Sequence, residues 1–553
     1  MTSAFSSRTR ARRVLIATAG ISAAAIALAG CSAGGGNGGN GNGGGSGGGD
    51  NVILVGTTDK VTTLDPAGSY DNGSLAVQTQ VFPYLLNSQY GSPDVEPDIA
   101  ESAEFTSPTQ YTVVLKEGLK WANGNDLTAS DVKFTFDRQI AIADPNGPSS
   151  LLYNLDSVDV EDELTAVFNL KSENDQVFPQ ILSSFPGAIV DEDSFSATEL
   201  TSDDDIVAAN AFAGQYTITE YEFNSLVEFT PYEGYQGLLG PAENDGVILS
   251  VYADSSNLKL DVQEGEIDVA HRSLAPTDIE DLRGNDEVVV HDGPGGEIRY
   301  IVFNFDTMPY GATTPEADPA KAQAVRQAAA SLIDREAIAE QVYKGTYTPL
   351  YSPVPDGFTG AVEPFKDLYG DGQGGPDADK AAQALEAAGV ETPVQLSLQY
   401  NSDDHYGPSS GEEYALVKSQ LEEGGLFQVD LQSTEWVQYS EDRTADVYPA
   451  YQLGWFPDYS DADNYLTPFF LEENFLANHY VNTEVADLIR QQAVTTDAAE
   501  RTSIIEQIQQ LEAEDISTLP LLQGAQVAVS GPEVDGVTLD ASFKFRYAPL
   551  SKG

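Results

Sequence analysis

The sequence predicts a mixed α/β or α+β fold built from several lobes. Strand-like and helix-like patterns are mixed along the chain, and no segment repeats at the period of a solenoid. The chain has 553 residues, which at about 100–200 residues per domain corresponds to roughly two to four domains. Its apolar content of 41% is typical of a globular protein and too high for a disordered one.

The charge of the chain excludes several classes of partner and cofactor. The formal net charge is −60, and the sequence contains four histidines and a single cysteine. Such a field repels nucleic-acid phosphates and argues against adhesion to anionic lipid through a basic face. One cysteine allows no disulfide within the chain, and few histidines leave little material for a metal site. We therefore expect no nucleic-acid partner, no cofactor and no metal. Nothing in the sequence demands an oligomer, and the expected state is a monomer.

The N-terminus has the pattern of a secretory signal. Four arginines between Arg8 and Arg13 precede an apolar stretch from Val14 to Ala29, which is short for a membrane span. The segment Leu28-Ala29-Gly30-Cys31 resembles the lipobox of bacterial lipoproteins, in which the cysteine is acylated and becomes the first residue. The resemblance implies a lipid anchor on Cys31, and two acyl chains suffice for stable anchoring. An ordinary secretory signal with a chance cysteine is the alternative.

A flexible tether and then a folded body follow the signal. Ser32 to Asp50 is almost entirely Gly, Asn and Ser, which orders poorly without a core. The body therefore begins near Asn51. Its hydrophobic runs predict the following strands, the last of them buried on both faces: Val52–Val55, Tyr111–Leu115, Ala166–Leu170, Val227–Thr230 and Ile298–Phe305.

Helical periodicity is clearest in the second half. The apolar stripe from Val325 to Ile333 predicts one helix over Lys321–Tyr343. A second helix is expected over Asp377–Ala388, with Gly389 at its C-terminal cap. Asp497 and Glu500 have the spacing of a capping box, and an isoleucine-rich stripe follows them. We interpret these stripes as core-facing surfaces.

A series of segments in fixed order resembles family 5 of the bacterial solute-binding proteins, the oligopeptide- and dipeptide-binding family. The resemblance extends from about residue 52 to residue 550. Its segments are Leu64-Asp65-Pro66, Pro83-Tyr84-Leu85-Leu86, Glu96 to Ser102, Val114 to Trp121, Asn123 to Val132, Gly265 to Asp268, Val325 to Ala328, Ile333 to Ile338 and Gly454 to Asp461.

The resemblance implies a two-lobed, periplasmic-binding-protein-like fold (type II, cluster C) with a two-strand hinge and an inserted extra domain. It implies that the protein is the extracytoplasmic substrate-binding subunit of an ABC importer, that it captures peptides and delivers them to permease and ATPase partners, and that it is not an enzyme. The expected division is a signal peptide (1–30), a tether (31–50), lobe I (51–88, 208–295 and 525–553), the inserted domain (89–207) and lobe III (296–524).

The resemblance also implies where a peptide is held. A buried ammonium requires a carboxylate, and the family's aspartate three residues after the tryptophan of a Gly-Trp motif corresponds to Asp458. A solvated loop acid is the alternative, because Asp461 and Asp463 lie beside it. Backbone around Gly454, Trp455 and Phe456 is expected to pair with extended ligand backbone.

Further contacts are expected from other segments. Tyr70 and Asn72 are expected to contact ligand backbone, and Trp455 is either a pocket wall or part of the core. His405 lies in a segment whose histidine meets the far end of the ligand in relatives, and a surface histidine is the alternative. Gln452 stands where some oligopeptide binders carry a basic residue, and no evident Arg or Lys takes its place.

Several alternative functions stay open, because Gln452 departs from the pattern of the oligopeptide binders. Relatives in this family also carry sugars, opines, nickel chelates and haem, so a non-peptide solute is one alternative, and a ligand-sensing surface receptor on the same fold is another. The segment Gly407 to Gly411 satisfies G-x-S-x-G with Ser409 at its centre, but the predicted strand before it ends near Tyr400, too early for a nucleophile elbow. We therefore expect no hydrolase.

Overall fold

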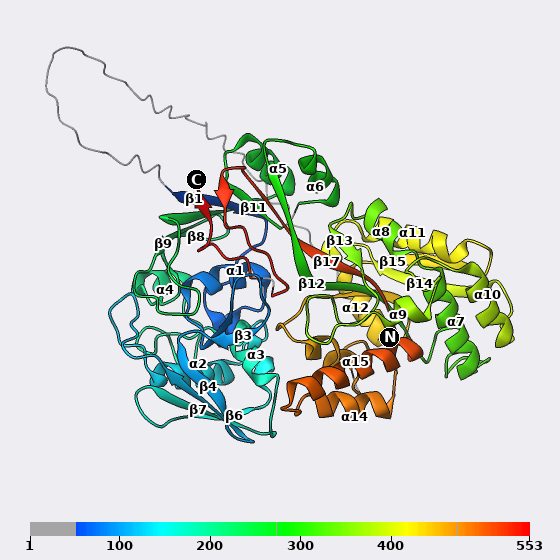
Figure 1. The fold of residues 1–553 in the computed structure, drawn as a ribbon, viewed down its shortest axis with the longest axis horizontal. Helices are drawn as coiled ribbons and strands as arrows, with labels where there is room; N and C mark the ends of the chain where they lie inside the picture. The colour runs from blue at the N-terminus through cyan, green and yellow to red at the C-terminus, as the bar shows by residue number, and fades with distance from the viewer. Residues whose placement is uncertain (1–50, 273, 473, 543) are drawn as a thin grey trace, which may run out of the picture. The chain divides into compact units, whose positions relative to one another are not determined.

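The computed structural model describes residues 51–272, 274–472, 474–542 and 544–553, so the predicted signal peptide, Cys31 and the tether lie outside the described residues. The described part contains an eleven-stranded sheet (Figure 1). In sheet order its strands are β15 (Phe427–Thr434), β14 (Val394–Asn401), β16 (Ala450–Trp455), β12 (Val289–Phe303), β17 (Thr518–Ser530), β11 (Val269–His271), β1 (Val52–Thr57), β10 (Gly246–Val251), β9 (Leu226–Pro231) and β8 (Tyr216–Glu222), with β13 (Tyr347–Pro349) also on β17.

The two longest strands, β12 and β17, connect the two halves of this sheet (Figure 1). They pair antiparallel from Val289 opposite Ser530 to Val302 opposite Thr518, with an irregularity between Pro294 and Ile298. The half of β17 that ends at Ser530 pairs with β11, whereas the half of β12 that ends at Phe303 pairs with β16. The same two strands therefore belong to both halves, and the irregularity marks the change from one half to the other.

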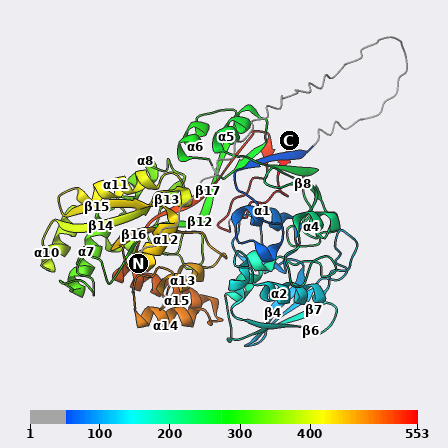
Figure 2. The ribbon, with the colours of Figure 1, turned by 180° about the vertical axis from the view of Figure 1, so that it is seen from behind.

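A separate antiparallel sheet has the order β4 (Ala100–Ser107), β5 (Gln110–Leu115), β7 (Thr165–Leu170) and β6 (Leu155–Val160). Helix α2 (Ala129–Ile142) packs on it, as seen from behind in Figure 2. A capping box of Thr128 and Asp131 starts this helix. Phe136 on the helix meets Phe168 on β7 edge to face, with ring centroids 5.0 Å apart. Smaller pairs are β2 (Leu86–Ser88) with β3 (Val95–Pro97) and β18 (Val534–Asp535) with β19 (Ser551–Lys552).

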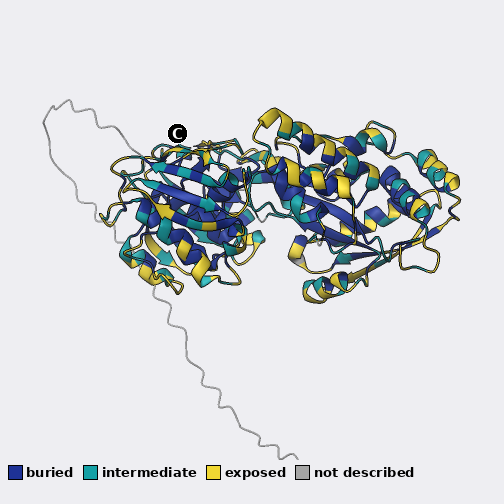
Figure 3. Ribbon diagram, turned by 90° about the horizontal axis from the view of Figure 1, so that it is seen from below, coloured by how far each residue is buried: buried dark blue, intermediate teal, exposed yellow. Residues whose placement is uncertain are grey.

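Helices cover the sheets, and their outer faces are exposed while the strands of the large sheet are mostly buried (Figure 3). The other α-helices are α1 (Asn72–Val81), α3 (Phe178–Leu182), α4 (Asp203–Ala209), α5 (Ser255–Glu264), α6 (Pro276–Arg283), α7 (Pro319–Leu332), α8 (Arg335–Gln341), α9 (Pro364–Leu368), α10 (Ala378–Ala387), α11 (Ser410–Glu422), α12 (Trp436–Thr444), α13 (Thr467–Phe470), α14 (Thr483–Gln492) and α15 (Ala498–Asp515). Short 3-10 helices are η1 (Pro66–Gly68), η2 (Pro148–Leu152), η3 (Phe185–Gly187), η4 (Asp404–Tyr406) and η5 (Ala462–Tyr465).

The predicted strands are confirmed as β1, β5, β7, β9 and the second half of β12. Helix α10 is capped by Asp377 at its start, and Gly389, with φ of 66°, follows its end as predicted. The carboxylate of Asp497 accepts the backbone N–H of Glu500 at 2.9 Å at the start of α15. The side chains of Ile504, Ile505 and Ile508 on that helix are buried.

The prediction of a single helix over Lys321–Tyr343 is wrong. The chain leaves the helical conformation at Ile333, and Asp334 then caps a second helix by accepting the N–H of Ala337 at 2.9 Å. The apolar periodicity continues across the break because Val325 and Ile338 are buried in the same core. Hydrophobic spacing therefore did not reveal the interruption, whereas the helix-capping aspartate did carry a signal for it.

The beginning and the end of the described chain pack in one core. Buried side chains from β1, from β8 to β10 and from Phe545 to Leu550 form a single hydrophobic cluster. The side-chain oxygen of Asn51 accepts the N–H of Lys552 at 2.8 Å, and the Lys552 ammonium lies 2.9 Å from Asp268. Among the described residues, none of the helices combines the length and the apolar content needed to cross a bilayer.

His271, at the end of β11, is buried without a charge. Its ring stacks on Phe545 with centroids 4.1 Å apart, and burial, with a smaller effect of the Arg272 charge, lowers its pKa to about 3. Because the folded-state pKa lies below the unfolded value, the unfolded chain binds the proton first as the pH falls below about 6.5. The free energy of unfolding should therefore fall by about 3 kcal/mol between pH 7 and pH 4 because of this group.

Chemical denaturation of His271→Leu over that pH range tests this expectation. The variant should lose less stability on acidification than the parent chain by about that amount. The replacement His271→Gln, which also removes the titrating imidazole, is the matched control and should reduce the loss on acidification by the same amount. Parallel pH profiles for the parent chain and His271→Leu would contradict the assignment.

Candidate ligand-binding site

Asp458 is held in the loop that follows β16. Asn464, on η5, fixes this loop through three hydrogen bonds. The Asn464 side-chain oxygen accepts the backbone N–H of Asp458 at 2.8 Å and the indole N–H of Trp455 at 2.9 Å, and its amide nitrogen donates to Asp458 Oδ2 at 3.1 Å. Asn464 is therefore a positioning residue that the sequence did not single out.

The other carboxylate oxygen of Asp458 accepts the hydroxyl of Tyr70, which lies 388 residues earlier in the chain. The Tyr70 ring is fixed edge-on against Phe185, with centroids 4.8 Å apart. Burial raises the pKa of Asp458, and the hydrogen bonds from Tyr70 and Asn464 oppose this rise. Asn72 and Asp458 line the same small cavity of about 20 Å³. The structure thus brings Tyr70, Asn72 and Asp458 together.

The acids beside Asp458 have structural partners. Asp461 receives both terminal nitrogens of Arg501, at 2.7 and 2.8 Å. Asp463 is buried, which raises its pKa to about 6, and it accepts the hydroxyl groups of Tyr459 at 2.9 Å and Thr467 at 2.6 Å. These two carboxylates are therefore engaged by protein groups that hold the loop in place.

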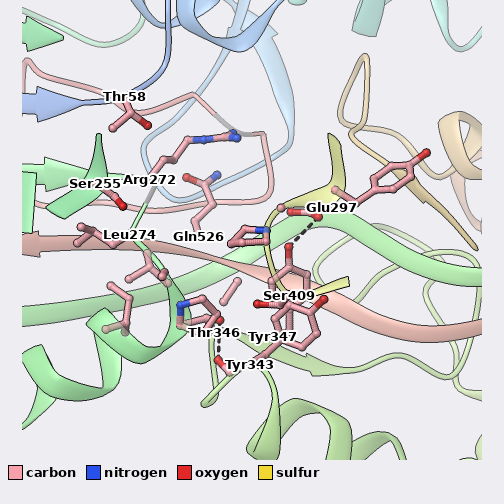
Figure 4. A pocket seen from close by; sticks show the side chains of 18 of the residues that line it. Thr58, Ser255, Arg272, Leu274, Glu297, Tyr343, Thr346, Tyr347, Ser409 and Gln526 are labelled. Carbon is pink, nitrogen blue, oxygen red and sulfur yellow. Dashed lines mark hydrogen bonds between the residues drawn. The ribbon is translucent and has the colours of Figure 1, made fainter. Parts of the chain in front are cut away.

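A larger cavity of about 630 Å³ lies beside this loop (Figure 4). This volume is within the usual range for small-molecule sites, about 300–1,000 Å³. Its walls come from segments far apart in the sequence, including the start of α5, the end of β11, β12, the α8–β13 connection and η4. Of the residues expected to contact a ligand, His405 and Phe456 line it, whereas Asp458, Trp455 and Gly454 do not.

Two arginines that the sequence did not reveal line this cavity. Arg272 follows β11 with φ of 61°; its Nε lies 3.1 Å from a carboxylate oxygen of Asp59, and its guanidinium lies 5.7 Å from the ring centre of Phe456. Arg299, on β12, is 3% exposed and lies 3.2 Å from Glu413. The sequence showed no evident Arg or Lys in place of the basic residue that Gln452 replaces, and the structure places these two arginines in the cavity wall. Arg299 lies on β12 and Arg272 directly follows β11, and only the fold places them at one cavity.

The wall around Arg299 is a buried polar network. The hydroxyl of Tyr343 donates to Glu413 at 2.7 Å, and the hydroxyl of Tyr347 donates to Glu297 at 2.7 Å. Glu297 also lies 3.5 Å from Arg299. Burial raises the pKa of Glu413, and the charge of Arg299 opposes that rise. The network fixes the tyrosines and charged groups that face the cavity.

The remaining predicted residues have structural neighbours. Trp455 packs against Phe469 and Phe475, with ring centroids 5.2 and 5.3 Å away, so its partly buried ring lies against the core. A side chain at Gly454 would come within 2.9 Å of the Tyr406 ring, so glycine allows this close packing. The imidazole of His405 stacks on Trp436 at 3.6 Å, and burial lowers the pKa of His405.

Gln452 is buried beneath this surface. Its oxygen accepts the N–H of Asn401 at 2.9 Å, and its nitrogen donates to the Ser410 hydroxyl at 3.0 Å. The residue that replaces a basic group of some relatives therefore cross-links β16 to neighbouring segments. It takes no part in lining the cavity.

The segment around Ser409 is no nucleophile elbow. The preceding strand ends at Asn401, and η4 separates it from Ser409, which caps α11 in a helical conformation. His479, the histidine downstream, pairs with Asp446 at 2.6 Å. Ser409 lines the cavity as an ordinary polar residue (Figure 4). Among the described residues, no group of three or more His, Cys, Asp or Glu side chains is arranged to hold a metal ion.

The chain is similar in sequence and in fold to several known proteins. Heme-binding protein A of Haemophilus influenzae is 24% identical over 83% of this chain and 85% of its own. Dipeptide-binding protein DppE of Bacillus subtilis is 24% identical over 88% of this chain and 89% of its own. The structure of HbpA2 from Haemophilus parasuis superposes with a TM-score of 0.78 at 20% identity, over 91% of this chain and all of that one.

The likeness to HbpA2 and the split sheet show the two-lobed α/β fold. Residues 94–476, more than half of the chain, match the family described as bacterial extracellular solute-binding proteins, family 5 Middle. The chain therefore belongs to family 5 of the bacterial extracellular solute-binding proteins, which bind solutes for transport and are not enzymes.

Proposed function

We propose that this chain is the substrate-binding subunit of an ABC importer and that its substrates are short peptides. The observation that supports this most is the Asp458 carboxylate, which is largely removed from water and already receives donors from Tyr70 and Asn464. A buried carboxylate of this kind matches an ammonium, which every peptide with a free N-terminus carries. The dipeptide-binding relative from Bacillus subtilis supports the same class of ligand.

In this proposal the peptide amine binds Asp458 and the following residues extend past Phe456 into the cavity. Phe456 lines the cavity, and the next residues, Pro457 and Asp458, line the small space beside Tyr70. Backbone of this loop and of the segment around Asn72 pairs with the peptide backbone, which makes recognition independent of ligand sequence at that end. Tyr70 gives up its hydrogen bond, or shares it, when the ammonium arrives.

The proposed motion uses β12 and β17 as the hinge. The proposal keeps the division expected from the sequence, namely lobe I (51–88, 208–295 and 525–553), the inserted domain (89–207) and lobe III (296–524). Tyr70 belongs to the first of these parts and Asp458 to lobe III, so a ligand at Asp458 contacts both lobes. Such a ligand favours the closed form by its differential affinity, and the closed form then docks on the permeases.

A melting-temperature screen of the purified protein tests the ligand class. The panel contains tripeptides, sugars, opines, nickel chelates and haem, the last because one relative is a heme-binding protein. A ligand present at 100 times its dissociation constant should stabilise the fold by about 2.7 kcal/mol. Stabilisation by peptides supports the proposal. Stabilisation by haem, sugars or chelates alone would refute the peptide assignment. If cells that lack the gene take up the stabilising peptide as fast as the parent cells, a surface receptor is favoured over an importer subunit.

The lipid anchor on Cys31 is part of the proposal. We expect the protein to sediment with membranes and its N-terminal peptide to carry two acyl chains on Cys31. Cys31→Ala should release the protein from the membrane fraction without changing its ligand binding. Fractionation followed by mass spectrometry of the N-terminal peptide measures both. A Cys31→Ala protein that still sediments with membranes would contradict the anchor.

A further inference from the structure

The charges in the wall of the 630 Å³ cavity are unbalanced. Four charged side chains line it, namely Asp254, Arg272, Glu297 and Arg299 (Figure 4 labels Arg272 and Glu297). The two arginines are already paired with carboxylates outside the lining set, Arg272 with Asp59 and Arg299 with Glu413. The arginines therefore bring no net positive charge, and the two lining acids remain.

The pairing of Arg299 with Glu413 is the step on which this balance depends. Glu413 is fully buried, and its Oε2 receives both Arg299 Nη1 at 3.2 Å and the hydroxyl of Tyr343 at 2.7 Å. Two donors on one oxygen fit an ionised carboxylate. Arg299 also lies 3.5 Å from Glu297, so one guanidinium faces two carboxylates and this cluster has an excess of negative charge.

Glu297 and Asp254 differ in how much of their charge is available to a ligand. Asp254 is exposed, and it caps α5 by accepting the N–H groups of Ser256 and Asn257, each at 3.1 Å. The helix N-terminus compensates part of its charge. Glu297 is largely buried, with 13% of its side chain exposed, and its Oε1 accepts the hydroxyl of Tyr347. Its Oε2 accepts no hydrogen bond from the described residues.

The surroundings of Glu297 favour a cation. Tyr343 and Tyr347 line the cavity beside it, but the Arg299 guanidinium already lies 5.1 and 5.0 Å from their ring centres, so the preference rests on the carboxylate charge. An acidic ligand group would meet like charges in a partly buried site, which is costly, whereas a neutral one would leave the excess negative charge of Glu297 and Glu413 over Arg299 uncompensated. A cationic group satisfies both the free carboxylate oxygen and the charge balance.

We propose that this cavity takes the positively charged side chain of a lysine or arginine in the bound peptide, and that Glu297 selects it. The inference rests on the proposed peptide function and narrows it to cationic peptides. Asp458 holds the amine common to all peptides, and Glu297 reads one side chain. Glu297 is thus a specificity-determining residue. Its replacement should change the preference for a cationic side chain more than the affinity for peptides in general.

Calorimetric titration with matched tripeptides tests this assignment. Lysine is placed in turn at each position of an alanine tripeptide, and glutamine and glutamate replace it in parallel peptides. The full chain should bind at least one lysyl peptide ten times or more tightly than the glutaminyl counterpart, and the glutamyl peptide most weakly. Glu297→Gln should remove this preference while leaving the glutaminyl peptide within about twofold.

Two further variants keep the test decisive. Asp254→Asn makes the same change of charge in the same cavity and should alter the lysyl preference less than threefold, whereas Glu297→Asp should retain most of it. Should Glu297→Gln fail to fold, the titrations of the parent chain and of Glu297→Asp still decide. Equal affinity of the parent chain for lysyl and glutaminyl peptides, or an intact preference in Glu297→Gln, overturns the inference. Absence of binding to any peptide overturns the proposed function instead.

Discussion

Asp458→Asn is expected to weaken the binding of every peptide by roughly 100-fold or more. The side chain keeps its size and its contact with Asn464, but the ligand ammonium then lies in a largely buried site without an opposite charge. Because burial raises the pKa of Asp458, binding should also weaken on acidification at a higher pH than an exposed aspartate would require. Calorimetric titration at several pH values measures both effects.

The control for this prediction is Asp487→Asn. Asp487 lies on α14, its side chain is 73% exposed, and it pairs only loosely with Arg490 at 3.3 Å. The same chemical change there should leave peptide affinity within about twofold. Unchanged affinity in Asp458→Asn would show that the amine is held elsewhere, and the direction proposed for the peptide would then be wrong.

Asp65→Ala is expected to lower the free energy of unfolding by about 3–5 kcal/mol. Both Asp65 and Arg138 are almost completely buried, and two guanidinium nitrogens donate to the carboxylate at 2.8 and 2.5 Å. The same carboxylate accepts the N–H groups of Ala67 at 3.0 Å and Thr201 at 2.7 Å. Removing it leaves a buried guanidinium without its partner, which is the costly case.

Denaturant titration measures this loss, and the chain offers a matched control. Arg490 and Glu472 form an exposed ion pair, with 52% and 46% of their side chains accessible. Glu472→Ala should cost less than about 1 kcal/mol. The double variant Asp65→Leu with Arg138→Met should recover part of the stability lost in Asp65→Ala, because no unpaired charge remains. A loss below about 1 kcal/mol in Asp65→Ala would contradict the importance of the pair.

The strands were predictable where a short hydrophobic run is bounded by turn residues. β1, β5, β7 and β9 were found because their hydrophobic runs end at turns. The first half of β12 was missed, because Gly293, Pro294, Gly295 and Gly296 argue against a strand. Pairing with β17 overrides that local preference, and the region is where the two halves of the sheet meet. The break at Ile333 was missed for the opposite reason, since the apolar pattern runs through it.

The site was predictable only where a motif marks it. Asp458 follows a Gly-Trp motif, and the structure gives it the partner Tyr70, which the sequence suggested from an independent segment. Arg272 and Glu297, by contrast, meet at one cavity only because β11 and β12 flank β17 in the same sheet. No spacing in a single sequence encodes that neighbourhood. The charge balance around Glu297 therefore had to come from the fold.

The most direct test of the central claim is a pair of titrations of the purified protein with one lysyl tripeptide, free or acetylated at its N-terminus. Acetylation removes the ammonium and leaves the rest of the ligand unchanged. The account predicts binding of the free peptide and a loss of roughly 100-fold on acetylation, with the difference abolished in Asp458→Asn. Equal binding of the two forms, or binding of neither, would contradict it.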